Sequence, residues 1–455
     1  MNSPKLLVPR FAATAAVFLA ITAAAAPGRA EPGDDLTVSV LTFGPGDHPF
    51  FKFGHNAILV QQQSRGEPTL ARGVPSQEGL GTLSGFPVGS WAYNFGTFAF
   101  DSPALIPKFL RGRFKYWLSV SSVEETMESY AAANRSILAQ ELDLSAGQKW
   151  ALWRALRENA RPENREYLYD YFRDNCSTRV RDAVDRVVEG GVRRAGQGAA
   201  AGTFRSDALR MVADLWPEYV GIYLGLGRAA DVPINRWEAA FLPERLAELL
   251  RTVRVPDGAG DKRLVKSEKV LHQARRPDKP AAPPRWGGYF LILGLVLGAT
   301  LALLGRLAKR VVAARVILGC AVSGVGGSFG LLGLIMLLLW ACTDHRIAFA
   351  NANILQFAPW ASVLFGYGIG VALGRPRATR RARAIVLSIA ACSLAGILCK
   401  ALPGANQDNW PFILLCLPIW LGMLRGLSEL GRVPKYAPLG HHPAGRPATF
   451  LGAGV

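Results

Sequence analysis

One cysteine stands apart in the first part of the chain. Cys176 lies in the polar run DNCST, whereas the other five cysteines all follow Trp286 in apolar segments. Asn175 or Asp174 suits the N-cap of a helix, which would place Cys176 in the first turn. There the free N–H groups and the helix dipole can lower the pKa of a thiol. The polar context therefore indicates a nucleophile, although a free cysteine is more commonly a small buried side chain.

A cysteine nucleophile needs a base within reach, and histidine is the usual one. His55 lies in FKFGHNAILV, where Gly54 permits close backbone approach and the apolar run that follows predicts a strand. His48 lies in the turn-like sequence GPGDHPF. Taken alone, His55 is best interpreted as a satisfied histidine at a strand end. Together with a single thiol at a helix start, it becomes the better candidate for the base.

These two side chains must be positioned by a domain that we expect to cover residues 31–252. Short runs of β-branched and apolar residues predict three or four strands in LTVSVLTFG, NAILVQQ, GSWAYNFGTFAF and RFKYWLSVSSV. The fold class is therefore α+β, a small sheet with helices packed to one side. Four helices are predicted. The first begins at a capping box formed by Ser145 and Gln148, and the second runs from Cys176 to Gly190 or Gly191. The other two lie near 205–215 and 237–251.

The chain begins with a pattern typical of export. Residues 1–30 have basic residues first, then the apolar run from Phe11 to Ala26, then small residues before Glu31. This order predicts a secretory signal peptide, with an uncleaved N-terminal anchor as the alternative. The first domain is therefore expected to fold outside the cytoplasm.

The composition changes abruptly after Arg285. The segment 253–285 is basic and Pro-rich and is predicted to be a juxtamembrane linker. The domain 286–427 is predicted to cross a membrane five times, because each apolar stretch approaches the roughly 20 residues that a spanning helix needs. Buried helices of a soluble protein would show polar faces over such lengths. The stretches are approximately 286–307, 312–341, 354–374, 384–402 and 411–427.

The positive charges give these spans an orientation. They gather after the first, third and fifth stretches, so these ends are expected in the cytoplasm together with the tail 428–455. The same residues explain much of the net charge of +18, which makes nucleic acid an improbable partner for an exported domain. They are Arg306, Lys309, Arg310 and Arg315, then Arg375, Arg377, Arg380, Arg381 and Arg383, then Arg425, Arg432 and Lys435.

A second polar group, TDHRIAFANAN, follows the second stretch. It contains Asp344, His345, Asn351 and Asn353, which this orientation places outside, facing the exported domain. Polar residues at membrane depth are often functional, although a solvated loop with a helix cap is the simpler interpretation. Metal binding by one histidine and one aspartate is a weak option. Cysteines at zinc spacing and nucleotide-binding glycine motifs are both missing, so no cofactor is expected.

A series of motifs resembles one known family. The motifs FGHNAILV, YNFGTFAF, FLRGRFKYWL, YDYFRDNCSTRVRD, WEAAFLPERL and CTDHRIAFANANIL are similar to those of bacterial membrane proteins with an Lnb-type N-terminal periplasmic domain. That family resembles the permuted NlpC/P60 branch of papain-like folds, in which the catalytic histidine precedes the cysteine. Characterised members are lipoprotein N-acyltransferases. The resemblance implies Cys176 as nucleophile, His55 as base, and a multi-pass protein of the bacterial inner membrane with a periplasmic catalytic domain.

The third catalytic position is left open between two asparagines. Asn94 in YNFG or Asn56 beside the histidine could orient the imidazole. Asn94 is geometrically easier, because adjacent residues on one strand point to opposite faces. Tyr169 or Tyr171 could donate to an oxyanion, and a packing role for either is an equal alternative. Because the family resemblance includes Asp344, His345, Asn351 and Asn353, we expect these to bind a lipid head group or the acceptor peptide.

The expected reaction moves an acyl chain from a membrane phospholipid, through a thioester on Cys176, to the N-terminal amine of a lipoprotein. A membrane-tethered cysteine peptidase or amidase of the cell envelope would use the same cysteine and histidine. A phospholipid hydrolase would share the first half of the reaction and use water as acceptor. A non-catalytic receptor would need neither Cys176 nor His55.

Overall fold

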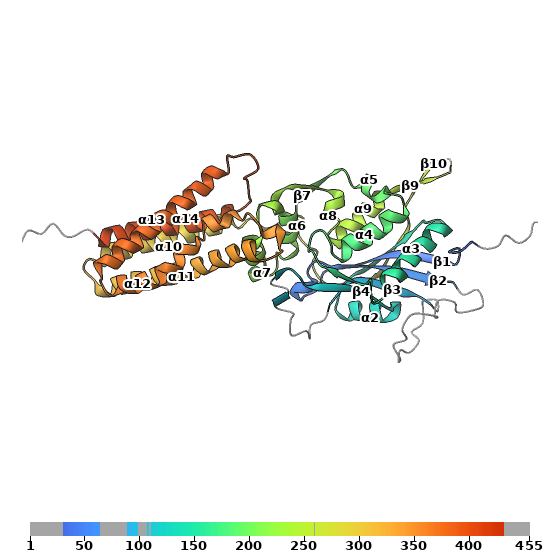
Figure 1. The fold of residues 1–455 in the computed structure, drawn as a ribbon, viewed down its shortest axis with the longest axis horizontal. Coiled ribbons are helices and arrows are strands. Elements are labelled where there is room, and N and C mark those ends of the chain that lie inside the picture. Colours follow the sequence, from blue (N-terminus) through green and yellow to red (C-terminus); the bar gives the residue numbers. More distant parts are fainter. Residues whose placement is uncertain (1–30, 64–88, 99–106, 109–110, 259, 432–455) are drawn as a thin grey trace, which may run out of the picture.

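The computed structural model describes residues 31–63, 89–98, 107–108, 111–258 and 260–431. The predicted signal segment 1–30, the end of the third predicted strand and residues 432–455 of the predicted tail lie outside the described residues. The molecule is elongated, with an α+β part at one end and a bundle of long helices at the other (Figure 1). The predicted α+β domain followed by a helical membrane part is thus confirmed.

The α+β part is built on one antiparallel sheet of seven strands in the order β11-β5-β1-β2-β3-β4-β6. Four of these strands are the predicted ones, and three were not predicted. The predicted strands are β1 (Leu36–Phe43), β2 (His55–Gln62), β3 (Trp91–Thr97) and β4 (Lys115–Ser122). The additional strands are β5 (Ile137–Leu142), β6 (Glu166–Leu168) and β11 (Val265–His272).

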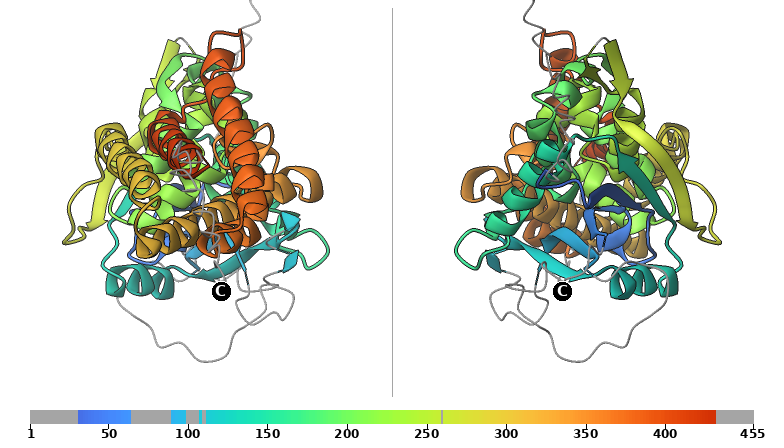
Figure 2. Two further views of the ribbon diagram at one scale, coloured as in Figure 1. Left: turned by 90° about the vertical axis from the view of Figure 1, so that its left-hand side faces the viewer. Right: turned by 90° about the vertical axis from the view of Figure 1, so that its right-hand side faces the viewer.

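Helices cover both faces of this sheet, not one face as expected. Strand β1 shows why, because Val38 and Val40 pack into one apolar cluster while Leu41 and Phe43 pack into another. Successive side chains of a strand point to opposite faces, so a continuous apolar run is buried on both. Helices α3 (Ala146–Asn159), α4 (Cys176–Val187) and α9 (Pro243–Thr252) cover one face, and α2 (Val123–Ala132) covers the other (Figures 1 and 2).

The predicted helix boundaries are close to those observed. The capping box at Ser145 is present, with Ser145 accepting from the Gln148 amide and Gln148 accepting in return. The helix predicted near 237–251 is interrupted, because Pro243 starts a new helix at its first turn. The remaining elements of this part are η1 (Pro49–Phe51), α5 (Gly191–Ala195), β7 (Ala199–Thr203), α6 (Phe204–Met211), α7 (Trp216–Gly225), η2 (Arg228–Asp231), β8 (Pro233–Asn235) and α8 (Arg236–Ala239).

The segment predicted as a linker, 253–285, contributes structure to the α+β part. Strand β11 pairs with β5 along the edge of the sheet, and β9 (Arg254–Asp257) forms a hairpin with β10 (Gly260–Arg263). The charged sequence VKSEKVLH concealed this strand, since an edge strand needs few apolar side chains. A stretch without helix or strand, 273–286, then leads to the first long helix.

The helical part has four helices that are long and apolar enough to cross a membrane, or five spans if one bent pair is counted. The bent pair, Arg346–Leu355 and Pro359–Ala372, changes direction by 56°. It contains η3 (Arg346–Ala348), η4 (Ala352–Leu355), η5 (Pro359–Val363) and α12 (Leu364–Ala372). The four long helices are α10 (Gly287–Leu307), α11 (Val312–Cys342), α13 (Pro376–Cys399) and α14 (Trp410–Leu430).

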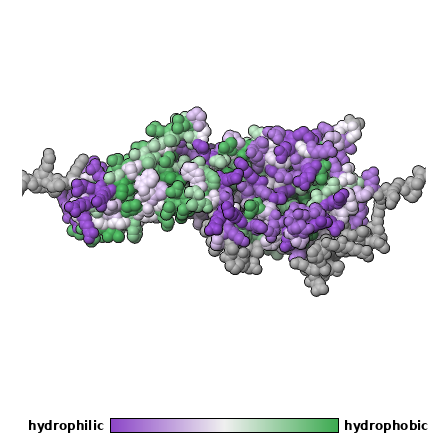
Figure 3. Space-filling model, viewed as in Figure 1, coloured by the Kyte–Doolittle hydropathy of each residue, from purple (hydrophilic) through white to green (hydrophobic). Residues whose placement is uncertain are grey.

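The second half of the bent pair follows α11 along much of its length. A Cβ atom at Gly333 of α11 would collide with the Phe357 carbonyl, and one at Gly319 would collide with the Ala372 backbone. These two glycines are fourteen positions apart in the α-helix, about 21 Å at 1.5 Å per residue. Figure 3 shows a hydrophobic band between a hydrophilic far end of the bundle and the hydrophilic α+β part.

Candidate active site

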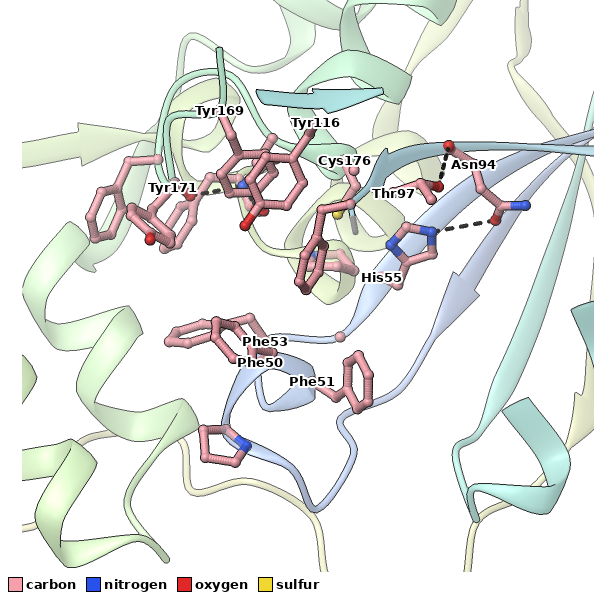
Figure 4. A pocket seen from close by; sticks show the side chains of 18 of the residues that line it. Phe50, Phe51, Phe53, His55, Asn94, Thr97, Tyr116, Tyr169, Tyr171 and Cys176 are labelled. Carbon is pink, nitrogen blue, oxygen red and sulfur yellow. Dashed lines mark hydrogen bonds between the residues drawn. The ribbon is translucent and has the colours of Figure 1, made fainter. Parts of the chain in front are cut away.

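A cavity of about 720 Å³ lies where the α+β part meets the end of α11. Cys176, His55 and Asn94 all line it, as Figure 4 shows. Most of the remaining wall is aromatic or aliphatic, and it comes from both parts of the molecule. Examples are Phe53, Tyr116, Tyr169, Ile222, Leu226 and Leu339. A pocket of this size and character is typical of a site for an apolar ligand.

The helix cap holds Cys176 in place. Cys176 is the first residue of α4, and Asn175 is its N-cap, as predicted. The Thr178 amide donates to Asn175 Oδ1 at 2.9 Å, and the Asn175 amide donates to Thr178 Oγ1 at 2.8 Å. Asn175 Nδ2 also donates to the carbonyls of Tyr171 and Phe241. Because these bonds are buried or partly buried, they hold the start of α4 and the thiol on it in place.

The thiol pKa differs from the sequence expectation. Burial raises the pKa of Cys176, and this effect outweighs the N–H groups of Asn56 and Ser177 and the charge of Arg135, which all favour the thiolate. The helix N-terminus does act in the expected direction, but a thiol that is only 8% exposed loses more from desolvation. Cys176 is therefore a protonated thiol at neutral pH, and it would need a base to act as a nucleophile.

Gly96 makes room for Cys176. It lies at an irregularity in the pairing of β3 with β4 and has φ +88°, a conformation that favours glycine. A Cβ atom added there would lie 3.3 Å from the Cβ atom of Cys176. The sequence analysis missed this residue, although an isolated glycine inside a strand pattern often marks a bulge or a close approach.

His55 is the first residue of β2 and is held on three sides. Its Nε2 atom is 3.4 Å from Asn94 Oδ1, and the rings of Phe43 and Tyr130 stack at 5.8 and 5.9 Å. The pKa of His55 is lowered to about 3: burial is the main cause, the charge of Arg135 adds to it, and the Asn94 hydrogen bond opposes both. The imidazole is therefore neutral at physiological pH and able to accept a proton.

A chain of hydrogen bonds determines which imidazole nitrogen accepts that proton. Thr126 donates its hydroxyl hydrogen to the Ser122 carbonyl, so Ser121 must be the donor in the 2.8 Å contact between Ser121 and Thr126. Ser121 Oγ then accepts from Asn94 Nδ2 at 3.0 Å, which turns Asn94 Oδ1 toward His55.

The imidazole must donate to this oxygen, so Nε2 carries the hydrogen and Nδ1 is the basic atom. Figure 4 shows the His55 ring between Asn94 and Cys176, with its second nitrogen on the side of the thiol. Among the described residues no hydrogen bond joins the thiol to the ring; catalytic contacts commonly tighten only when substrate binds.

The other candidates near the thiol have different surroundings. Asn56 is fully buried and donates to the Leu41 carbonyl and to Thr42 Oγ1, so its side chain is directed to β1 and not to the imidazole. Of the two asparagines left open, the geometry thus favours Asn94. Tyr169 stacks on Tyr116 at 4.0 Å and lines the cavity. Burial raises the pKa values of Tyr169 and Tyr171 well above the usual range, so both phenols are hydrogen-bond donors.

The loop after α11 divides into two parts. Asp344 accepts from Arg113 Nε at 2.6 Å, and its amide donates to the Arg111 carbonyl at 2.9 Å. This exposed contact holds the loop against the segment before β4. His345 lines the cavity and stacks on Tyr171 with the ring centroids 6.5 Å apart. The structure therefore brings His345 to the same cavity as Cys176, whereas Asp344 is not among the residues that line it.

Asn351 and Asn353 are placed elsewhere, in a buried hydrogen-bond network. Both donate to the Leu224 carbonyl at the end of α7, at 2.7 and 3.0 Å. Their oxygens accept from Gln407 and Asn409, at 3.0 and 3.1 Å. Neither asparagine is among the residues that line the cavity. These contacts join the α+β part to the helical part, which differs from the expected role in substrate binding.

Three polar residues of the cavity wall were not found from the sequence. They are Ser121 in β4, Thr126 in α2 and Arg135 in the turn before β5. No local pattern marks them, because they meet only when the sheet has formed. Among the described residues, no group of three His, Cys, Asp or Glu side chains lies close enough to hold a metal ion.

Comparison with known proteins gives one match. Residues 28–208 match the family described as the Lnb N-terminal periplasmic domain. The matched range includes Cys176, His55, Asn94 and Arg135, and apolar helices follow it. Neither a curated protein nor a solved structure matches the chain.

Proposed function

Because residues 28–208 belong to the Lnb N-terminal periplasmic domain family, we propose that this protein is a lipoprotein N-acyltransferase with Cys176 as nucleophile and His55 as base. One observation carries the proposal. The thiol and the imidazole line an apolar cavity whose wall includes Leu339, a residue of the candidate membrane span α11. A water-soluble peptide substrate would have no need for such a wall, whereas an acyl chain that comes from a bilayer would.

The first half-reaction is acylation of the enzyme. His55 Nδ1 takes the thiol proton while the Cys176 sulfur attacks an ester carbonyl of a phospholipid. The carbon–oxygen bond then breaks, and His55 returns the proton to the departing glycerol oxygen. The products are an acyl-thioester on Cys176 and a lysophospholipid. The backbone N–H groups of Asn56 and Ser177 lie near the sulfur, and a donor to the oxyanion is worth roughly 3 kcal/mol in comparable sites.

The second half-reaction is transfer to the acceptor. The N-terminal amine of a lipid-modified lipoprotein attacks the thioester, and His55 accepts a proton from that nitrogen. The carbon–sulfur bond breaks, the amide forms, and the proton passes to the cysteine sulfur. Donor and acceptor are both anchored in the bilayer, so attachment of the domain to membrane helices raises their effective concentration. His345 and Asp344 are our candidates for contact with a head group or the acceptor.

The test is mass spectrometry of the full-length protein purified from membranes. We expect an acyl adduct on Cys176 that hydroxylamine removes, and N-acylated lipoprotein in cells that express the protein. Cys176→Ser should abolish both. Cys342→Ser, which removes an exposed cysteine at the end of α11, should leave both unchanged.

Other results would point to a different activity. Release of fatty acid without any acylated lipoprotein would identify a phospholipid hydrolase. An unmodified Cys176 together with cleavage of envelope peptides would identify a peptidase or amidase. Either result would overturn the proposed function.

A further inference from the structure

The cavity contains a buried cation that the proposed chemistry does not use. Arg135 lines the cavity and is only 3% exposed. Its guanidinium packs on the ring of Tyr130 at 4.5 Å and on the ring of Phe51 at 5.3 Å. Its Nε atom donates to the Gly44 carbonyl at 2.8 Å. The side chain is therefore fixed between two aromatic rings, at one position on the cavity wall.

Part of the hydrogen-bonding capacity of this guanidinium is unused. Arg135 donates to the Gly44 carbonyl and forms a side-chain hydrogen bond with Tyr130, but Nη2 has no hydrogen-bond partner among the described residues. Nη2 is also shielded from solvent. No carboxylate of the described residues lies within ion-pair distance of Arg135. Burial of a cation without a partner is costly, so an arginine in this setting is suited to an anion from outside the protein.

The guanidinium is close to the reacting groups. Tyr130 carries Arg135 on its ring, and the same ring stacks with His55 at 5.9 Å. The charge of Arg135 acts on both His55 and Cys176. An anion bound at Arg135 would therefore lie one aromatic ring away from the imidazole. In a glycerophospholipid, the phosphate is separated from the ester carbonyls by only a few bonds of the glycerol unit.

We propose that Arg135 forms a phosphate subsite that binds the phosphodiester of the acyl donor and thereby positions the donor ester at Cys176. This inference rests on the proposed function and specifies its donor. Arginine suits the task because its planar guanidinium donates two parallel bonds to phosphate oxygens. A free phosphate ion offers the same oxygens, so the experiment must separate the two sources.

The experiment compares two acyl donors with identical chains. Wild-type protein in detergent is given phosphatidylglycerol or diacylglycerol, and the rate of thioester formation on Cys176 is measured for each. We expect wild type to prefer phosphatidylglycerol, and Arg135→Gln to lose at least about tenfold of this preference, the usual loss when one hydrogen bond to a charged group is removed. The ratio of two rates within one preparation does not depend on the folded fraction, so partial misfolding of the variant does not disturb it.

Arg181→Gln is the matched control. Arg181 is similarly buried and packs over Trp237 at 3.8 Å, but it lies outside the cavity lining. Its substitution should leave the donor ratio at the wild-type value. Arg135→Lys should recover part of the preference, because it retains the charge but not the paired donors.

The outcomes separate the two proposals. An unchanged donor ratio in Arg135→Gln, with normal thioester formation, overturns the phosphate subsite and leaves the acyltransferase intact. Thioester from neither donor in wild type overturns both. In a third measurement, inorganic phosphate is added at millimolar concentration as an inhibitor of thioester formation. If it inhibits wild type and not Arg135→Gln while the donor ratio is unchanged, the site binds free phosphate, and the assignment to the lipid is wrong.

Discussion

Two buried groups of polar side chains, one around His55 and one around Asn353, differ in what they leave unsatisfied. The side chains of Asn351 and Asn353 are paired with Leu224, Gln407 and Asn409, and neither asparagine lines the cavity that contains Cys176. Around His55, the bonds through Asn94 and Ser121 leave Nδ1 of the imidazole without a hydrogen-bond partner among the described residues, and that ring lines the cavity. The first network leaves Asn409 Oδ1 buried without a partner in the described part of the chain, away from that cavity, and serves to join two parts of the fold. The second leaves an open position on a cavity and is prepared for a reactant.

The largest expected effect comes from removing the imidazole of His55, whose Nδ1 atom is the open position. His55→Ala should lower the rate of thioester formation on Cys176 by about 10²–10⁴, the range for loss of a general base. Purified variants would be compared by the initial rate of acylation. His48→Ala, in the turn before η1, is the control and should react normally. Equal rates in His55→Ala and wild type would refute the assignment of the base.

The next largest effect is expected from Asn353→Ala, and it should change the stability of the protein and not the acylation rate. Asn353→Ala removes a donor to the Leu224 carbonyl and leaves Asn409 Nδ2 without its acceptor. We expect the free energy of unfolding to fall by about 1–3 kcal/mol, because a buried polar group loses its partner. Thermal unfolding in detergent would measure this.

The same variant then tests the comparison. Acylation of Cys176 per folded molecule should be unchanged in Asn353→Ala. Lost transfer at an unchanged unfolding temperature would instead support the original expectation that this asparagine binds substrate. Asn159→Ala, on the exposed end of α3, should alter neither quantity.

A smaller effect is expected from Ser121→Ala. This change removes the acceptor for Asn94 Nδ2. That hydrogen bond fixes the amide orientation in which Asn94 Oδ1 faces His55. The amide can then rotate and leave the imidazole without a fixed tautomer, so the acylation rate should fall about tenfold, the cost of roughly one hydrogen bond. The fraction of Nε2–H tautomer, read from ¹⁵N NMR of labelled histidine, should fall in parallel. A slower rate with the wild-type tautomer would refute the network.

The smallest expected effect is that of pH on the acylation rate, which should hardly change near neutral pH. The pKa of His55 is lowered to about 3 and that of Cys176 is raised. Both groups keep their required forms, neutral imidazole and protonated thiol, across neutral pH. Acylation rates should therefore be nearly flat between about pH 5 and about pH 8, with no decline near the ordinary histidine value. A decline centred near pH 6.5 would contradict the burial argument.

The stability should nevertheless fall in acid. The unfolded chain binds a proton at His55 near the ordinary value of 6.5, whereas the folded protein does so only near pH 3. The unfolded state therefore holds more protons in this window, and the contribution of His55 to the free energy of unfolding decreases as the pH falls below about 6.5.

The features that could be predicted from the sequence were local ones. The cap that positions Cys176 and the capping box at Ser145 are set by residues three apart, so their outcome does not depend on the rest of the fold. The same holds for the long apolar helices. The strand at His55 was found because its apolar run is continuous.

The missed features depend on contacts between distant segments. Arg135 and His55 come to the same tyrosine ring only because β5 and β2 both pair with β1. Ser121 contacts Asn94 only through the register of β3 with β4. The thiol pKa was misjudged for the same reason, since the burial that raises it comes from the assembled domain. The bend at Pro359 was missed because composition records apolar length and not direction.

The edge strand β11 has a consequence for how the domain can be isolated. A fragment that ended at residue 252, before β9, would expose the backbone N–H and C=O groups of β5 along one edge of the sheet. Unpaired edges recruit strands from other molecules, so this fragment should aggregate. A fragment ending near residue 276 retains β11 and the bonds from Arg276 to the Asn134 and Ala133 carbonyls. The strand β11 of the α+β part thus protects this part against self-association, and only a short stretch separates it from the first candidate membrane span.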